Sequence, residues 1–292
     1  MAARGGGVMA VFVTGATGIV GSAVVRELAW MGEPVIAGVR DPANQECPEG
    51  VTPRQFDFGF SVAEHERALA GVDRLFLMRP PAIADVESTL IPVIDAARRQ
   101  GVRQIVFLSL QGVQGNRRTP HFAVEQYLRR TGAPFTMLRP NFFMQNLVTA
   151  YASDIRERGV IFVPAGGART AFIDARDIGR VAASVFTEPG HVGKAYTLSG
   201  EQSLTYVDVA RIMTHVLGRP ISYGRPSEDE YLERLRVQGY PQDYLDVQKM
   251  IHRVVRLNVS ALPNHSIQKL TGSPATRLAQ FVQDNRAAWD PR

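Results

Sequence analysis

The stretch TGATGIVG, residues 14–21, decides the fold of this chain. It ends the apolar run 9–14, which is typical of a buried parallel strand. It also opens a segment, Ile19 to Trp30, whose apolar residues have helical spacing. A strand, a glycine-rich turn and a helix in this order form the phosphate loop of a dinucleotide-binding fold. The chain is therefore predicted to bind a dinucleotide at this loop.

Each glycine of the loop is expected for a physical reason. Gly15 allows the tight turn, Gly18 lets the backbone approach a pyrophosphate without a Cβ clash, and Gly21 lets the helix pack close to the strand. The N–H groups at the start of the helix are then free to bind phosphate. The loop residues expected to contact the cofactor are Gly15, Thr17, Gly18, Ile19, Val20 and Gly21.

The residue that selects between NADP(H) and NAD(H) is expected about 20 residues further on, at the end of the second strand. Arg40 and Asp41 occupy this place and Pro42 follows them. An arginine can bind a ribose 2′-phosphate bidentately, so Arg40 favours NADP(H) over NAD(H). Two alternatives remain: Asp41 could bind the ribose hydroxyl of NAD(H), or the three residues could form only a solvated turn.

Strands and helices alternate through the first half of the chain. Six alternating strands predict an α/β fold with a doubly wound parallel sheet of the Rossmann type. The first of these strands is the run 9–14 before the glycine loop. The others are expected at 34–39, 51–56, 72–78, 103–108 and 135–138. Helices are expected from Ser61, an N-cap candidate with Glu64 at the capping-box position, and over 82–100 and 121–130. Pro92 predicts a kink within the second of these.

The alternation loosens in the second half. We expect residues 1–150 to form the dinucleotide-binding domain, with later segments returning to the sheet, and residues 151–292 to form a smaller mixed substrate lobe. The segment 174–186 is expected to be helical in its second half, and 194–198 to be a short strand. Further helices are expected over 206–217, 227–237, 242–255 and 276–288.

Composition narrows the function classes. The net charge is +5, but the cations are spread in short pairs, so a basic surface that attracts a polyanionic cofactor is favoured over direct nucleic-acid binding. The single cysteine, Cys47, lies in a polar loop and is expected to be an incidental thiol in a reducing cytoplasm. The six histidines are scattered, so no metal site is predicted. No apolar run is long enough to span a membrane. Residues 1–7 are interpreted as a frayed tail rather than a signal peptide.

Several segments together resemble the NmrA-like family of atypical short-chain dehydrogenases/reductases, which includes a transcriptional co-regulator, a quinone reductase and a triphenylmethane dye reductase. The glycine spacing Gly-x-x-Gly-x-x-Gly is typical of this group. The resemblance covers nearly the whole chain and is specific for the family, but not for a substrate. The segments that carry it are 15–21, 75–81, 107–112, 121–128, 134–146, 172–178 and 194–200.

The resemblance implies which other residues contact cofactor and substrate. Such contacts are expected at the carboxyl ends of the strands, where ligands bind in sheets of this kind. The expected cofactor contacts are Asp57 and Phe58 near the adenine, Leu77, Met78 and Arg79 along the ribose, Ser109 and Leu110 near the nicotinamide, and Asn141, Phe142 and Phe143 beyond it. The substrate pocket is expected to include Phe142, Phe143 and Met144, whose side chains suit a flat apolar acceptor and equally suit an ordinary core.

The usual proton donor of short-chain dehydrogenases is a Tyr-x-x-x-Lys pair. Counted back from Pro134, its two positions hold Arg117 and His121. An ordinary ketone reduction needs an acid for the developing alkoxide, whereas a quinone or a cationic dye is already electrophilic. His121 is the best candidate for a catalytic acid or base, because an ordinary histidine pKa of ~6.5 lies close to neutral pH. It could also simply cap its helix or hydrogen-bond the cofactor or backbone.

Two functions follow from this pattern. The first is an NADPH-dependent reductase that transfers hydride to a small conjugated acceptor such as a quinone, a dye, an enone or a natural-product intermediate. The second is a redox-sensing protein that binds NADP(H), catalyses nothing and signals through a protein partner. A fuller C-terminal tail with an apolar pocket favours the enzyme, and the missing Tyr/Lys pair favours the sensor. A homodimer is also a possible assembly.

Overall fold

The computed structural model describes residues 9–290, so the expected tail at residues 1–7 lies outside the described part. The chain forms two compact units. The first unit comprises the described residues up to Pro140 together with Ala175–Leu198, and the second unit comprises Asn141–Asp174 together with the residues from Ser199 onward. The first unit is therefore discontinuous, because the chain leaves it after Pro140 and later returns to complete it.

The first unit is built on a seven-stranded sheet in the order β3-β2-β1-β4-β5-β6-β9, and every strand pair is parallel. The strand β1 lies between β2 and β4, with Phe12 opposite Ile36 on one side and Leu75 on the other. This order is the one of Rossmann-type folds, and the predicted α/β class is confirmed. The strands are β1 (Ala10–Val13), β2 (Val35–Val39), β3 (Val51–Gln55), β4 (Val72–Met78), β5 (Gln104–Leu108), β6 (Phe135–Pro140) and β9 (Lys194–Leu198).

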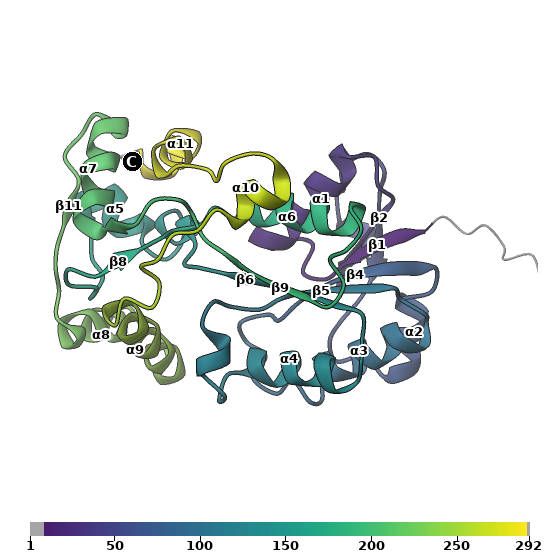
Figure 1. Cartoon of the computed structure of the whole chain (residues 1–292). Helices are drawn as coiled ribbons and strands as arrows, with labels where there is room; N and C mark the ends of the chain where they lie inside the picture. Colours follow the sequence, from purple (N-terminus) through teal and green to yellow (C-terminus); the bar gives the residue numbers. More distant parts are fainter. Residues whose placement is uncertain (1–8, 291–292) are drawn as a thin grey trace, which may run out of the picture. The chain divides into compact units, whose positions relative to one another are not determined.

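Helices cover both faces of this sheet (Figure 1). α1 (Ile19–Trp30) packs against α6 (Ala175–Thr187) on one face. On the other face, α3 (Leu90–Arg99) packs against both α2 (Val62–Ala68) and α4 (Pro120–Arg130). Two short 3₁₀ helices, η1 (Pro42–Asn44) and η2 (Val113–Gly115), lie in the loops after β2 and β5. The inner strands β1, β2 and β5 are fully buried because helices cover both faces of the sheet, whereas the edge strands β3 and β9 are partly exposed.

The capping box predicted for α2 is confirmed, since Ser61 accepts a hydrogen bond from the Glu64 backbone and the Glu64 carboxylate accepts one from the Ser61 N–H. The helix expected over 82–100 is shorter and starts only at Leu90. The kink predicted at Pro92 was wrong, because Pro92 is the third helical residue and a first-turn N–H has no intrahelical partner to lose. α6 is helical from Ala175 onward rather than only in its second half.

The second unit is mostly helical, with two small two-stranded sheets. Its core includes the fully buried Tyr206, Phe281 and Trp289. The expected helix over 276–288 is broken into α11 and η4, and α5 and α10 were not predicted. Its elements are η3 (Met144–Leu147), α5 (Ala152–Arg158), β7 (Val160–Ile161), β8 (Arg169–Thr170), β10 (Leu204–Thr205), α7 (Tyr206–Leu217), β11 (Ser222–Tyr223), α8 (Glu228–Val237), α9 (Gln242–Arg256), α10 (Ser266–Thr271), α11 (Leu278–Asp284) and η4 (Arg286–Trp289).

Among residues 9–290, no helix is both long enough and apolar enough to cross a bilayer.

Candidate functional site

The glycine loop between β1 and α1 is packed so tightly that it excludes side chains at two of its glycines. Gly15 has a φ of +61°, and a Cβ there would lie 2.6 Å from the Met78 sulfur. A Cβ on Gly21 would lie 2.0 Å from the Gly15 carbonyl oxygen, well inside any possible contact. The backbone of α1 therefore touches the backbone of the loop, which is the role expected for the last glycine of such a motif.

The first turn of α1 is open to an anion. Gly18 is the N-cap residue, and no side chain caps the helix or places an acidic group in its first turn. The leading N–H groups of a helix lack intrahelical acceptors and carry partial positive charge. An uncapped helix start that follows a glycine loop is accordingly a suitable site for a phosphate group.

The two residues after β2 have different roles. Asp41 caps η1, since its carboxylate accepts hydrogen bonds from the Ala43 N–H at 3.1 Å and from the Asn44 amide at 2.6 Å. These hydrogen bonds, the one from Asn44 first, lower the pKa of Asp41. The Arg40 side chain is exposed and forms no hydrogen bond or ion pair with any described residue. Arg40 is thus available to bind an anion, whereas the Asp41 carboxylate is engaged as a helix cap.

The hydroxyl group of Thr14 connects the glycine loop to the neighbouring strand β4. Thr14 is fully buried at the end of β1, and its hydroxyl donates to the Phe76 carbonyl and accepts from the Met78 N–H, both at 3.0 Å. The carboxyl ends of β1 and β4 are thereby held together. Sequence analysis placed Thr14 only within the motif and did not identify this bridge.

Arg79 directly follows the carboxyl end of β4, and its side chain stabilises the loop that begins there. Its Nη1 donates to the carbonyls of Pro80 and Pro81 at 3.0 Å and also to that of Ile83. Its Nε is buried without a partner among the described residues. Leu77, by contrast, is completely buried in the core of the first unit.

The end of β3 carries the two residues expected near the adenine. The Asp57 carboxylate accepts a hydrogen bond from the Gly59 N–H at 2.8 Å. The ring of Phe58 meets the ring of Phe56 edge-on, with centroids 5.1 Å apart. Both side chains therefore have local contacts that fix the loop after β3.

Ser109 directly follows the carboxyl end of β5, and His121 lies in the first turn of α4. The Ser109 hydroxyl is buried and has no hydrogen-bond partner among the described residues, although its N–H bonds to the Leu138 carbonyl at 2.7 Å. Leu110, next to it, is half-buried. An unsatisfied buried hydroxyl is unfavourable unless a ligand or water completes it, so Ser109 is a candidate ligand contact.

His121 lies in the first turn of α4, which Thr119 caps by accepting a hydrogen bond from the Phe122 N–H. The His121 ring lies 6.1 Å from the ring of Phe107. Burial and the nearby charge of Arg79 lower the pKa of His121 to about 4, although Glu125 opposes the shift. The expectation of an ordinary pKa near neutrality was wrong, because it took no account of these neighbours. At neutral pH the imidazole is uncharged and can donate only through its neutral N–H.

A buried ion pair fixes the helix that carries His121. Arg139 of β6 donates from Nε and Nη2 to the two carboxylate oxygens of Glu125, at 2.8 and 2.5 Å. Their side chains are only 8% and 3% exposed. This bidentate pair joins α4 to the sheet. It was not identified from the sequence, because Glu125 and Arg139 are 14 positions apart in separate segments and nothing along the chain pairs them.

The residues expected at the substrate lie at the start of the second unit. Asn141 is buried; its amide donates to the Ser260 carbonyl at 2.9 Å and its oxygen accepts from the Phe142 N–H. Phe143 pairs with Ile173 in an isolated parallel bridge, and the ring of Phe142 packs edge-on against Phe172. Met144 is 3% exposed and belongs to the core of this unit.

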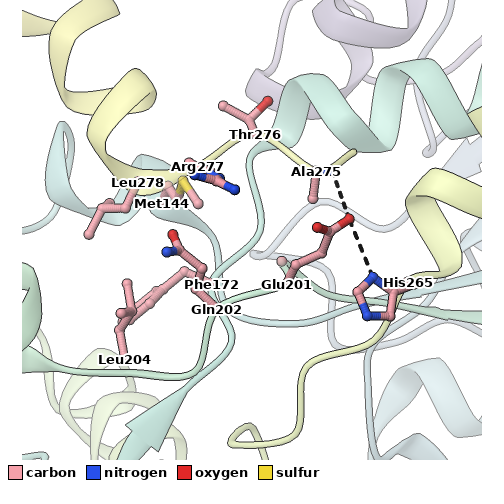
Figure 2. A pocket seen from close by; sticks show the side chains of 11 residues that line it. Met144, Phe172, Glu201, Gln202, Leu204, His265, Ala275, Thr276, Arg277 and Leu278 are labelled. Carbon is pink, nitrogen blue, oxygen red and sulfur yellow. Dashed lines mark hydrogen bonds and ion pairs between the residues drawn. The ribbon is translucent and has the colours of Figure 1, made fainter. Parts of the chain in front are cut away.

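Within the second unit, Met144 also lines a cavity of about 160 Å³ (Figure 2). A carboxylate oxygen of Glu201 lies 3.6 Å from Nδ1 of His265, and Arg277 lies on the side of Glu201 away from His265. Sequence analysis missed this cluster, since its members come from distant segments with no characteristic spacing. Elsewhere, in the first unit, a cavity of about 290 Å³ adjoins the glycine loop at Ala16 and Thr17 and is bordered by α1, β2 and residues 45–48.

Together, the strand order and the glycine loop define a dinucleotide-binding protein of the Rossmann type. The model of the NmrA-like family matches residues 9–279, so the chain belongs to the NmrA-like family.

Known relatives of the chain include several reductases. An NAD(P)H azoreductase of Xenophilus azovorans is 31% identical, with 96% of this chain and 99% of the relative covered. An NADPH-dependent quinone oxidoreductase of Escherichia coli, solved in complex with NADPH, has a TM-score of 0.84 at 30% identity, covering 94% and 99% of the two chains. The triphenylmethane reductase of Citrobacter sp. complexed with NADP(H) has a TM-score of 0.82 at 27% identity, with the same coverage of both chains. The predicted family is thereby confirmed.

Proposed function

We propose that the chain is an NADPH-dependent reductase that transfers hydride to a small conjugated acceptor, such as a quinone, a dye or an enone. The observation that carries the proposal is the glycine loop, in which a Cβ on Gly21 would lie 2.0 Å from the Gly15 carbonyl oxygen, followed by an uncapped helix. The relatives that reduce azo compounds, quinones and triphenylmethane dyes support the acceptor class.

The residues of the first unit fit a nicotinamide dinucleotide. The N–H groups at the start of α1, together with Gly15 to Gly21, would bind the pyrophosphate. Arg40, which is exposed and unpaired within the described chain, would bind the 2′-phosphate of NADPH, because Asp41 is engaged as the cap of η1. The remaining contacts are proposed from the carboxyl ends of the strands: Asp57, Phe58, Met78, Arg79, Ser109 and Leu110, with Asn141, Phe142 and Phe143 at the start of the second unit.

The bound nicotinamide would supply the hydride, and the protein would contribute mainly by positioning. The Ser109 hydroxyl has no hydrogen-bond partner among the described residues and could bind a ligand. The neutral His121 ring has one N–H that can donate a hydrogen bond. With Arg117 and His121 at the positions of the usual Tyr/Lys pair, the chain is suited to acceptors that are already electrophilic rather than to simple ketones.

For cofactor choice, Arg40→Ser should raise the KM for NADPH by about 10- to 100-fold, the value of a charge-assisted hydrogen-bonded pair. The KM for NADH should change little, because NADH has no 2′-phosphate. Steady-state kinetics with both cofactors measures this. The matched control is Arg67→Ser, another exposed arginine of the first unit. Equal loss with NADPH and NADH would contradict the assignment of Arg40 to the 2′-phosphate.

For His121, the rate of quinone reduction should be flat between about pH 5.5 and 8, since the pKa of about 4 keeps the ring neutral across this range. His121→Asn should retain most of the turnover because it keeps a neutral donor, whereas His121→Ala should lose about tenfold, the value of one hydrogen bond. A break near pH 6.5 in the native profile that disappears in His121→Asn would instead identify a catalytic acid.

The function itself is tested by following NADPH absorbance in the presence of a panel of quinones, azo and triphenylmethane dyes, and enones. We expect cofactor consumption with at least one class, and none with simple ketones. If NADPH binds but is not consumed with any member of the panel, the redox-sensing alternative replaces the reductase.

A further inference from the structure

The cavity of about 160 Å³ in the second unit has an apolar floor. Met144, Phe172 and Leu278 are each at most 3% exposed and line it together with the half-buried Leu204. The Phe172 ring is held edge-on by Tyr206, with centroids 5.5 Å apart. The floor is therefore rigid, and it is large enough for one six-membered ring, since a cavity of ~150 Å³ accommodates benzene.

The rim of the same cavity is charged. Arg277 lines it and is exposed, and its guanidinium forms no hydrogen bond or ion pair with the described residues. Glu201 is already engaged, because one of its oxygens accepts from the Ala275 N–H at 3.3 Å and faces the His265 ring at 3.6 Å (Figure 2). The only charge of this rim left without a partner among the described residues is thus the guanidinium of Arg277.

We propose that this cavity is a binding site for a small carboxylate carried on an apolar body of about one ring, with Arg277 binding the carboxylate and Phe172, Met144 and Leu278 covering the ring. A guanidinium presents two parallel N–H donors that match a carboxylate, which gives the site its preference for a planar anion. The apolar floor adds the burial of one ring face.

The charge arrangement argues against a cationic ligand. Among the described residues that line the cavity, Glu201 is the only acidic one, and one of its oxygens is already engaged by the Ala275 N–H and faces the His265 ring. A cation would meet the unpaired Arg277 as a like charge, whereas an anion neutralises it. The proposal concerns the second unit alone and does not depend on the proposed reductase activity.

The test is a calorimetric titration of the full-length protein with three probes: benzoate, benzyl alcohol and acetate. Benzoate, which has both the ring and the charge, should bind saturably with a Kd of about 1 mM or lower. Benzyl alcohol lacks the charge and acetate lacks the ring, so each should bind at least about tenfold more weakly. Benzoate binding should persist when NADPH is present at saturation, because the site belongs to the second unit.

The variant Arg277→Gln should weaken benzoate binding by about tenfold or more and leave benzyl alcohol binding unchanged. Lys269→Gln is the matched control, since it removes an exposed cation of the same unit that does not line the cavity. The proposal is overturned if benzoate shows no saturable binding, if NADPH displaces it, or if Arg277→Gln and Lys269→Gln bind it equally well. Loss of NADPH oxidation without loss of benzoate binding would count only against the reductase.

Discussion

Gly21→Ala should reduce the affinity for NADPH by about 100-fold or more, because the new methyl group would lie 2.0 Å from the Gly15 carbonyl oxygen and 2.6 Å from its carbonyl carbon. Both atoms are backbone, so neither can move aside without reshaping the loop. The loop N–H groups would then no longer converge on one phosphate. Fluorescence titration with NADPH measures the loss, and the overpacking should also lower the free energy of unfolding by about 1–3 kcal/mol.

Gly115→Ala is the matched control for this variant. It adds the same methyl group to another glycine of the first unit, but one with open space around it and an ordinary φ. Its affinity for NADPH and its stability should remain at the native level. Native-like NADPH binding by Gly21→Ala would mean that the cofactor is not held at this loop.

Arg139→Met should be the most destabilising single change, at about 3–5 kcal/mol, because it leaves the buried Glu125 carboxylate without its partner. The double variant Glu125→Met/Arg139→Met removes both charges and should recover most of this loss, since a buried ion pair is about as stable as a well-packed apolar pair. Urea unfolding followed by circular dichroism measures all three proteins.

The control is Arg236→Met, which breaks an ion pair whose side chains are 55% and 62% exposed. Screening by water makes such a pair nearly neutral, so the change should stay below about 1 kcal/mol. A loss for Arg139→Met as small as that of the control would show that the Glu125 carboxylate is solvated after all. A double variant no more stable than the single one would show that packing, rather than charge, is the main contribution.

The sheet could be predicted from the sequence because each buried strand is a short apolar run bounded by turn residues. The strand expected at 135–138 is present as Phe135–Pro140, and that at 194–198 has the expected bounds. The predicted start of the helix over 82–100 was wrong. Asp85 accepts hydrogen bonds from the Glu87 and Ser88 N–H groups there and forms a turn instead. Apolar periodicity alone does not detect such local side-chain competition.

For the candidate site, the glycine loop could be predicted because its function requires contiguous residues. The pKa of His121 could not, since it depends first on burial in the folded chain and then on Arg79, which is far away in the sequence. The cap that Asp41 forms on η1 could not be predicted either, because the sequence leaves the roles of Arg40 and Asp41 open. The cluster of Glu201, His265 and Arg277 is assembled only by the folded second unit and leaves no pattern along the chain.

The discontinuity of the first unit has a consequence for its synthesis on the ribosome. The outer edge of β6 pairs with β9, so it has no neighbour until Leu198 has been made. At ~5–20 residues per second, the nascent chain carries this open edge for several seconds after Pro140 is added. An unpaired parallel edge readily captures another strand, which makes this interval the point at which chaperones should matter most. A fragment that ends at residue 140 or 150 would keep that edge open permanently.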